Sequence, residues 1–276
     1  MAAIPLEEET FYPESDGEPM GETDLHVEEI VYLREALKRR FEETPDVYVA
    51  SNLLLFYREG YPREFVVPDV MVVRGVPKEF RRNYLLWKEG VPPQLVIEVT
   101  SDKTWKKDLS TKMNLYEQMG VQEYFLFDPY DEHLESQVQG FRLARHRYSA
   151  IRPERDRSLI STTTGVAFHM EGVRLRLIDA STGVPLLRPA EEAAARRKAE
   201  MRAVTEIEAR RQAEVRATTE AEARRQAEVR ATAEAKVRRQ AEIRAARAEE
   251  VAAAEAARVR ALEEEIERLR GRKEPE

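Results

Sequence analysis

The amino-acid sequence predicts an α/β domain with a mixed sheet, followed by a long C-terminal helix. Amphipathic helical patterns alternate with apolar, strand-like runs up to about residue 188, an alternation typical of α/β domains. Every aromatic residue precedes position 170, whereas residues 190–270 contain no Gly, Pro or aromatic residue. The net charge is −8 over residues 1–188 and +1 over residues 189–276. We therefore expect a folded domain over residues 21–188 and a helical tail over residues 189–276.

The composition narrows the class of protein. The chain has 276 residues and no Cys, which excludes disulfides, thiolate metal sites and Cys nucleophiles. Residues 1–20 are acidic and polar, and we expect them to be disordered. They lack the basic start and apolar run of a signal peptide. Because no run of about 18 apolar residues occurs, we expect no membrane span and a cytoplasmic protein.

The first predicted elements are a helix and a pair of strands. The segment "ETDLHVEEIVYLREALKRRFEETPD" begins with Thr23 or Asp24 as a helix cap, and Pro45 ends it. Its residues Ile30, Leu33, Leu37 and Phe41 fall on one helical face. The next segments, "VYVASNLLLFY" and "REFVVPDVMVV", are apolar and lie on either side of "REGYP". This arrangement predicts two strands joined by a turn.

The following elements predict a parallel strand pair with a helical crossover. "QLVIEVTS" is a continuous apolar run, which is typical of a central strand. "DLSTKMNLYEQMG" is a second helix that Asp108 or Ser110 would cap and Gly120 would end. "VQEYFLFDP" follows as the parallel partner strand. The later segments "GFRLARHRYSAI" and "GVRLRLID" suggest an accessory β-meander.

The tail repeats with a period of 14 residues. "RRQAEVRATTEAEA", "RRQAEVRATAEAKV" and "RRQAEIRAARAEEV" follow one another, so that Val215, Val229 and Ile243 recur at one position. Ala, Glu and Arg are strong helix formers, and a helix over 190–270 would be roughly 120 Å long. We expect a helix that self-associates as a coiled coil into a dimer. The alternative is a solvated single helix held by i, i+4 salt pairs.

Two acids stand inside otherwise apolar strands, where an unpaired carboxylate is costly. Asp69 lies in "FVVPDVMVV" and Glu98 lies in "QLVIEVTS". Lys112 shares the inner face of the second helix with Leu109 and Tyr116. Two carboxylates with a nearby ammonium suit a magnesium-assisted phosphodiester hydrolysis. Alternatively, Asp69 only begins a strand, Glu98 pairs with an Arg and Lys112 extends to solvent.

A family resemblance rests on three segments. "PDVMVV", "VIEVTS" and "DLSTKMNLYEQMGVQEYFLFDP" resemble the restriction-endonuclease-like (Uma2-type) family of the PD-(D/E)XK nuclease superfamily, over roughly residues 20–185. The resemblance implies a restriction-endonuclease-like mixed sheet flanked by helices, with Asp69 and Glu98 holding Mg²⁺ or Mn²⁺. The superfamily's lysine stands two residues after the second acid, but here that residue is Thr100. The resemblance places the catalytic lysine at Lys112.

Weaker candidates surround this trio. The resemblance suggests an acid or His on the first helix, either His26 or Glu29, although His26 could instead cap the helix or border the core. Ser101 and Tyr116 could assist at the site, although Ser101 could simply end its strand. The segment "KTWKK" could bind nucleic acid or could be a solvated loop; its candidate contacts are Lys103, Trp105, Lys106 and Lys107. A second basic loop contains Arg81, Arg82 and Lys88.

The expected function is a metal-dependent endonuclease that hydrolyses DNA, with the tail joining two copies. The alternative is a catalytically inactive nuclease-fold protein that acts as a binding or assembly module through its tail. Thr100 in place of the usual lysine favours this alternative. A structural coiled-coil protein with a capping head would explain the tail but not the acids inside the strands.

Overall fold

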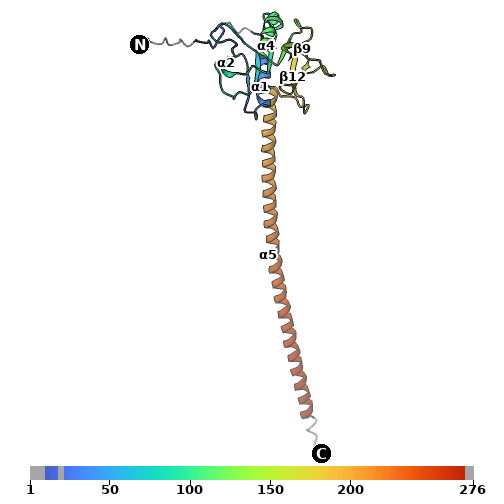
Figure 1. Ribbon diagram of the computed structural model, residues 1–276. Helices are drawn as coiled ribbons and strands as arrows, with labels where there is room; N and C mark the ends of the chain where they lie inside the picture. Colours follow the sequence, from blue (N-terminus) through green and yellow to red (C-terminus); the bar gives the residue numbers. More distant parts are fainter. Residues whose placement is uncertain (1–9, 18–21, 271–276) are drawn as a thin grey trace, which may run out of the picture. The chain divides into compact units, whose positions relative to one another are not determined.

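The computed structural model describes residues 10–17 and 22–270 of the chain (Figure 1). It begins with helix α1 (Asp24–Arg40), whose N-cap is Thr23: its hydroxyl accepts a hydrogen bond from the backbone N–H of His26. The helix continues to Phe41, in agreement with the expected first helix. Its apolar face packs on the main sheet and contributes Leu33 and Leu37, both fully buried.

The main sheet has six strands in the order β1-β4-β6-β7-β8-β9. Strands β6 and β7 run parallel, with Glu98 opposite Leu126, and all other neighbouring pairs are antiparallel. The predicted central strand is therefore confirmed as β6. The strand bounds are β1 (Val47–Ala50), β4 (Val70–Arg74), β6 (Leu95–Val99), β7 (Glu123–Phe127), β8 (Val138–Ala144) and β9 (Arg147–Ala150).

The crossover from β6 to β7 is one continuous helical run with a wider turn inside it. It consists of α3 (Trp105–Lys107), a π-helical turn (Asp108–Lys112) and α4 (Met113–Met119). Gly120 ends the run with a φ of 83°, a left-handed conformation that suits glycine. The prediction that Asp108 or Ser110 caps this helix is wrong, because the run begins at Trp105 and both residues lie inside it.

Two small sheets cover the main one. The first contains β2 (Leu55–Phe56), β3 (Phe65–Val66) and β5 (Tyr84–Leu85), and is followed by the short α2 (Leu86–Glu89). The second is antiparallel and contains β10 (Leu159–Ser161), β11 (Val166–Glu171) and β12 (Arg174–Asp179). The expectation of an accessory meander from residue 140 onward is half wrong. Residues 138–150 extend the main sheet, because Phe141 pairs with Tyr124 of β7.

The main sheet has an apolar core on each face. On one face, α1 and the β10–β12 sheet pack against side chains such as Ile97 and Phe125. On the other face, the β2-β3-β5 sheet and α4 pack against Val96 and Leu126. Successive residues of a strand point to opposite faces. Glu98 therefore shares the second face with Val96, beneath α4.

Part of the N-terminal segment packs on the domain. The ring of Tyr12 lies 5.1 Å from the rings of both Phe56 and Trp87, and its hydroxyl accepts a hydrogen bond from Gly60. Residues 10–17 thus differ from the disordered N-terminus expected over 1–20. The remainder of that prediction concerns residues 1–9 and 18–20, which lie outside the described residues.

The C-terminal helix α5 (Pro189–Arg270) has 82 residues and starts where the composition changes. The chain divides into two compact units at Arg196/Arg197, so the first turns of α5 belong to the first unit. Beyond them, the apolar side chains at the repeat position, Val215, Val229 and Ile243, are exposed. Self-association of α5 stays a prediction. Throughout the part of the chain that the structure describes, every helix is too short or too polar to cross a lipid bilayer.

Candidate active site

Glu98 lies at the centre of a buried polar cluster. Its side chain is fully buried on β6, and both of its carboxylate oxygens have partners. Oε2 accepts hydrogen bonds from the Lys112 ammonium at 2.8 Å and from the backbone N–H of Asp69 at 3.4 Å. Oε1 accepts one from the Tyr116 hydroxyl at 2.6 Å. Glu98 therefore pairs with Lys112, and not with an Arg.

Asp69 lies beside Glu98 at the adjoining strand. It precedes β4, and its Oδ2 accepts a hydrogen bond of 2.7 Å from the backbone N–H of Val99 on β6. Asp69 as a whole residue is only partly buried, whereas Glu98 is fully buried. The structure thus brings together the two acids that the sequence singled out.

Lys112 joins two buried carboxylates. Its ammonium lies 2.8 Å from Glu98 and 3.1 Å from Oδ1 of Asp108, one turn earlier in the same helical run. Asp108 is 1% exposed and Lys112 is 20% exposed. The π-helical turn spans these two residues, and such turns are frequent at functional sites. Lys112 therefore has one partner on the sheet and one on its own helix.

Sequence reasoning assigned Asp108 to a helix cap and so missed its place in the cluster. The signal was the i, i+4 spacing from Lys112 on the same face, which brings opposite charges together.

Thr100 stands at the position where the sequence resemblance would place the lysine of the superfamily. Thr100 is 2% exposed and its hydroxyl donates to the Phe127 carbonyl at 3.1 Å, so it only ties β6 to β7.

Burial changes the protonation of all three acids. It raises the pKa of Glu98 to about 7 and that of Asp69 to about 6, while the Lys112 ammonium opposes both rises. Burial also raises the pKa of Asp108 to about 6, and the charge of Glu98 adds to the effect. Three acids close together share one ammonium. A further cation would relieve the repulsion among them.

His26 borders this cluster from helix α1. The residue is 5% exposed, and its Nδ1 is buried without a hydrogen-bond partner. Burial lowers the pKa of His26, and the charges of Glu22, Glu98 and Asp108 oppose this decrease. An unpartnered ring nitrogen near the acids could accept a proton or coordinate a metal ion.

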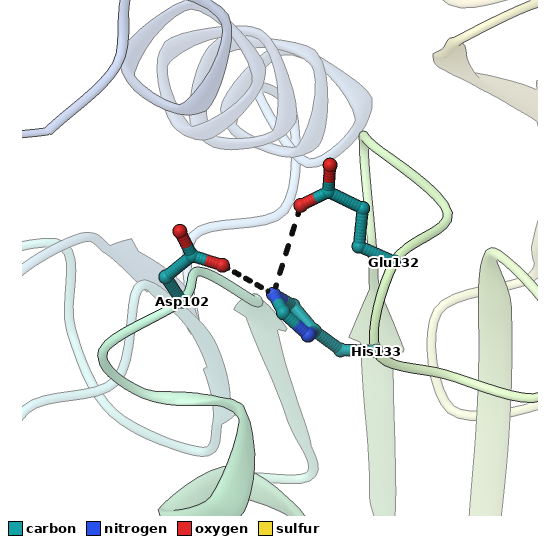
Figure 2. Close-up of side chains that lie close together, drawn as sticks. All are labelled: Asp102, Glu132 and His133. Atoms are coloured by element: carbon teal, nitrogen blue, oxygen red, sulfur yellow. Dashed lines mark hydrogen bonds and ion pairs between the residues drawn. The ribbon is translucent and has the colours of Figure 1, made fainter.

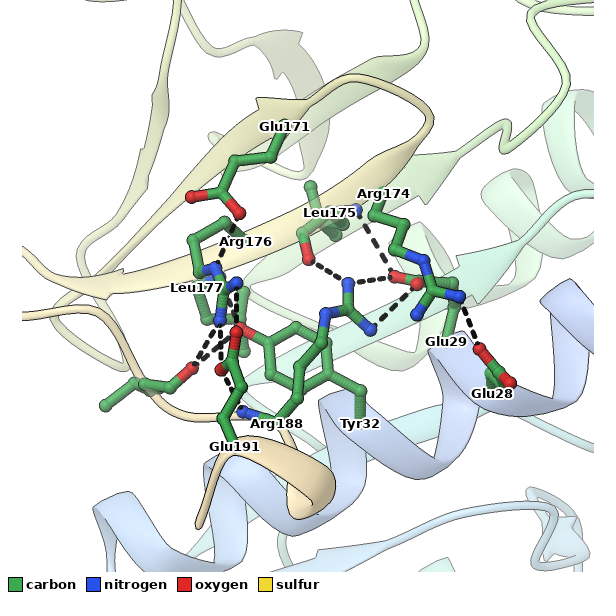
Figure 3. A network of polar contacts seen from close by, with 11 residues as sticks. Glu28, Glu29, Tyr32, Glu171, Arg174, Leu175, Arg176, Leu177, Arg188 and Glu191 are labelled. Atoms are coloured by element: carbon green, nitrogen blue, oxygen red, sulfur yellow. Dashed lines mark hydrogen bonds and ion pairs between the residues drawn. The ribbon is translucent and has the colours of Figure 1, made fainter. Parts of the chain in front are cut away.

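Glu29 does not belong to the cluster. It is fully buried one turn after His26, and it pairs with Arg188, whose Nη1 lies 2.9 Å from Oε1 of Glu29. Arg188 also covers the ring of Tyr32 at 4.0 Å (Figure 3). The structure therefore does not bring Glu29 to the cluster, and the Glu29 carboxylate pairs instead with the residue that precedes α5.

The remaining sequence candidates lie around the site without contacting Glu98. The Ser101 hydroxyl lies 3.2 Å from that of Thr104, where it stabilises the loop after β6. Trp105 stacks on the ring of His133, with 5.2 Å between the ring centroids. Three lysines of this segment are exposed: Lys103, Lys106 and Lys107. In the second basic loop, both arginines have acidic partners, Arg81 with Glu89 and Arg82 with Glu14.

A second acidic group lies close to Trp105. Asp102, Glu132 and His133 form a group whose ligand atoms all lie within 4.8 Å of one another (Figure 2). Nε2 of His133 is 2.8 Å from Asp102 and 4.0 Å from Glu132. Both carboxylates are exposed, unlike Glu98. Sequence reasoning missed His133 because it follows a different strand from Trp105.

A comparison with protein families agrees with the sequence resemblance. The family described as "Uma2: Putative restriction endonuclease" matches residues 3–171. No curated protein matches the chain. A solved structure described as "a putative nuclease belonging to DUF820" from Anabaena variabilis is similar over 55% of this chain and 81% of its own, with 15% identity and a TM-score of 0.39. Because the family match covers more than half of its length, the chain belongs to the Uma2 family of restriction-endonuclease-like proteins.

Proposed function

We propose that the protein is a metal-dependent endonuclease that hydrolyses DNA phosphodiester bonds with Mg²⁺ or Mn²⁺. The observation that carries this proposal is the cluster of Asp69, Glu98 and Lys112, with two carboxylates and one ammonium at the carboxyl end of β6. Membership of a nuclease-like family supports the same chemistry.

The donor set fits a hard divalent cation. Asp69 and Glu98 supply carboxylate oxygens from neighbouring strands, and magnesium typically uses one or two carboxylates together with water and phosphate. The unpartnered Nδ1 of His26 is a further donor nearby. When bound, the ion would polarise the phosphate and lower the pKa of an attacking water.

Tyr116 and Lys112 would orient the metal-binding carboxylate and stabilise the charge on the phosphate. Tyr116 donates to Oε1 of Glu98 and so fixes the orientation of that carboxylate. Lys112 keeps Asp108 as a partner, which holds its ammonium at the site when Glu98 binds the cation. There the ammonium would stabilise negative charge that develops on the phosphate oxygens.

A cleavage assay tests this proposal. Supercoiled plasmid and single-stranded DNA are incubated with the protein and Mg²⁺ or Mn²⁺, and with the variants Glu98→Gln and Asp69→Asn. We expect the parent to cut and both variants to lose cleavage by at least 100-fold. The variant Glu59→Gln, which removes an exposed carboxylate between β2 and β3, should cut like the parent. Equal cleavage by all four proteins would contradict the assignment.

A second candidate function is a catalytically inactive binding or assembly protein. Both oxygens of Glu98 already have partners within the protein, and Thr100 supplies no amine to the site. A melting titration with Mg²⁺ distinguishes the two functions, because a ligand of the folded state raises the melting temperature. A rise in the parent that disappears in Glu98→Gln supports the nuclease, and no rise supports the inactive protein.

We also propose that α5 joins two copies of the chain. Met201, Val215, Val229 and Ile243 recur every 14 residues and are all exposed, as the contact positions of an unpaired coiled-coil helix would be. Light scattering should give about twice the chain mass of 31.9 kDa. Replacing the last three of these residues with Asn should halve that mass. A parent that is monomeric at tens of micromolar would contradict the pairing.

A further inference from the structure

Two loops meet beyond the carboxyl ends of the parallel strands β6 and β7. The first contains Trp105 and follows β6; the second contains His133 and follows β7. The second loop is held by Asp128, a buried carboxylate that accepts hydrogen bonds from four backbone N–H groups. These N–H groups belong to Tyr130, Glu132, His133 and Leu134. His133 is therefore fixed by its backbone.

The aromatic side chains of the two loops stack on each other. The indole of Trp105 lies parallel to the His133 ring, with an interplanar angle of 5°. Asp102 fixes this ring from its edge, 2.8 Å from Nε2 (Figure 2). Trp105 is partly exposed, and Lys106 places its ammonium 5.3 Å from the indole centroid. We call Trp105 and His133 the aromatic shelf.

The shelf lies close to the candidate active site along the chain. Trp105 begins the helical run that carries Lys112 seven residues later, about two turns or roughly 10 Å along the helix. Its loop starts directly after β6, the strand of Glu98. A nucleic-acid strand with a phosphate at Lys112 would therefore place nearby bases at the shelf.

Charge and geometry determine what the shelf could bind. Lys103, Lys106 and Lys107 are exposed around Trp105, so phosphates are favoured there. On the other side, Asp102 and Glu132 would repel them. A base within a duplex has both faces covered by its neighbours and cannot stack on protein, whereas an unpaired base can.

We propose that the aromatic shelf binds an unpaired nucleobase, so that the preferred substrate is single-stranded DNA or DNA with a single-stranded segment at the site. This substrate class rests on the proposed nuclease function. The shelf acts in binding, however, and its test needs no cleavage.

Fluorescence of Trp105 gives the direct test. The chain has two Trp residues, and Trp87 packs against Tyr12 on the β2-β3-β5 side of the domain. In the full chain carrying Trp87→Phe, emission reports Trp105 alone. With EDTA present, we expect a short oligothymidylate to quench this emission and a blunt duplex of the same length to leave it nearly unchanged. Equal quenching by both, or none by the single strand, would overturn the proposal.

Two variants test the contribution of the shelf to affinity. Trp105→Leu keeps apolar bulk but removes the aromatic face, and Trp87→Phe is the matched control. Base stacking on one aromatic side chain corresponds to roughly fivefold or more in affinity. We expect Trp105→Leu to lose at least about fivefold in affinity for the single strand, with duplex affinity unchanged. Unchanged single-strand affinity in Trp105→Leu would overturn the shelf, whether or not the parent cleaves DNA.

The two proposals can fail separately. A parent that binds single strands through Trp105 but cuts no DNA with any metal would retain the shelf and remove the nuclease function. A parent that cuts DNA while Trp105→Leu binds and cuts single strands equally well would retain the nuclease and remove the shelf.

Discussion

Replacing Lys112 with Met tests the electrostatics of the cluster most sharply. The substitution keeps an unbranched side chain of nearly the same length but removes the ammonium that pairs with Glu98 at 2.8 Å and with Asp108 at 3.1 Å. Both carboxylates are almost completely buried. Removing one partner of a buried ion pair costs about 3–5 kcal/mol, because the other charge stays uncompensated.

The cost should depend on pH, with a sign that follows from the raised pKa values. The pKa of Glu98 rises from 4.5 to about 7, which corresponds to about 3 kcal/mol at 1.36 kcal/mol per pKa unit. An acid with a raised pKa in the folded state contributes full stability below its unfolded pKa and loses it as pH rises through the folded pKa. At pH 5 the acids are mostly protonated, so the ammonium of Lys112 compensates little negative charge. At pH 8 the acids are ionised, and the ammonium of Lys112 compensates their full charge.

Urea denaturation without metal, at pH 5 and pH 8, measures this dependence. We expect Lys112→Met to lower the free energy of unfolding by about 3–5 kcal/mol at pH 8 and by markedly less at pH 5. Lys107→Met is the matched control: Lys107 is exposed on the same helical run, so its loss should stay within about 0.5 kcal/mol. A loss below about 1 kcal/mol at pH 8, or an equal loss at both pH values, would show that Lys112 does not compensate the buried carboxylates.

The pH dependence of the cluster and the roles of two other buried carboxylates, Glu123 and Glu29, can also be measured. Without metal, the free energy of unfolding of the parent should fall between about pH 4 and pH 7. Mg²⁺ should raise the melting temperature of the parent more at pH 8 than at pH 5, because only ionised acids bind the cation. An equal rise at both pH values would contradict this. Glu123→Gln should lower the free energy of unfolding, measured by urea denaturation, by about 2–4 kcal/mol. The reason is that the fully buried Glu123 carboxylate accepts hydrogen bonds from the turn at residues 161–163 and from Arg142. A change below about 0.5 kcal/mol would contradict this role. Arg188→Ala should cost about 3–5 kcal/mol, because it leaves the buried Glu29 without its cationic partner. The same cost in the double variant with Glu29→Gln would contradict the pairing.

Local sequence patterns predicted most of the fold. The 3.6-residue apolar period of the first helix and the continuous apolar run of β6 are local signals, and both elements were found as expected. The assignment of residues 138–150 to a separate meander was wrong because strand pairing is a long-range property. Phe141 could pair with β7 or with a later strand, and nothing near it in sequence decides between them.

Two residues of the candidate site could be predicted because their charge conflicts with the burial of the strands around them. Asp69 and Glu98 are acids within apolar strands, and that cost pointed to a partner. Asp108 and His133 carried no such signal, because an acid before a helix and a His in a polar loop are ordinary. The pairing of Glu29 could not be predicted from the sequence either, because its partner Arg188 lies 159 residues away along the chain.

Diffraction from crystals soaked in Mn²⁺ would locate the ion through its anomalous signal, independently of any cleavage activity. We expect a peak within coordination distance of carboxylate oxygens from both Asp69 and Glu98, as the proposed metal site requires, and its loss in Glu98→Gln. A peak only between Asp102, Glu132 and His133, or no peak beside Glu98 at saturating Mn²⁺, would contradict it.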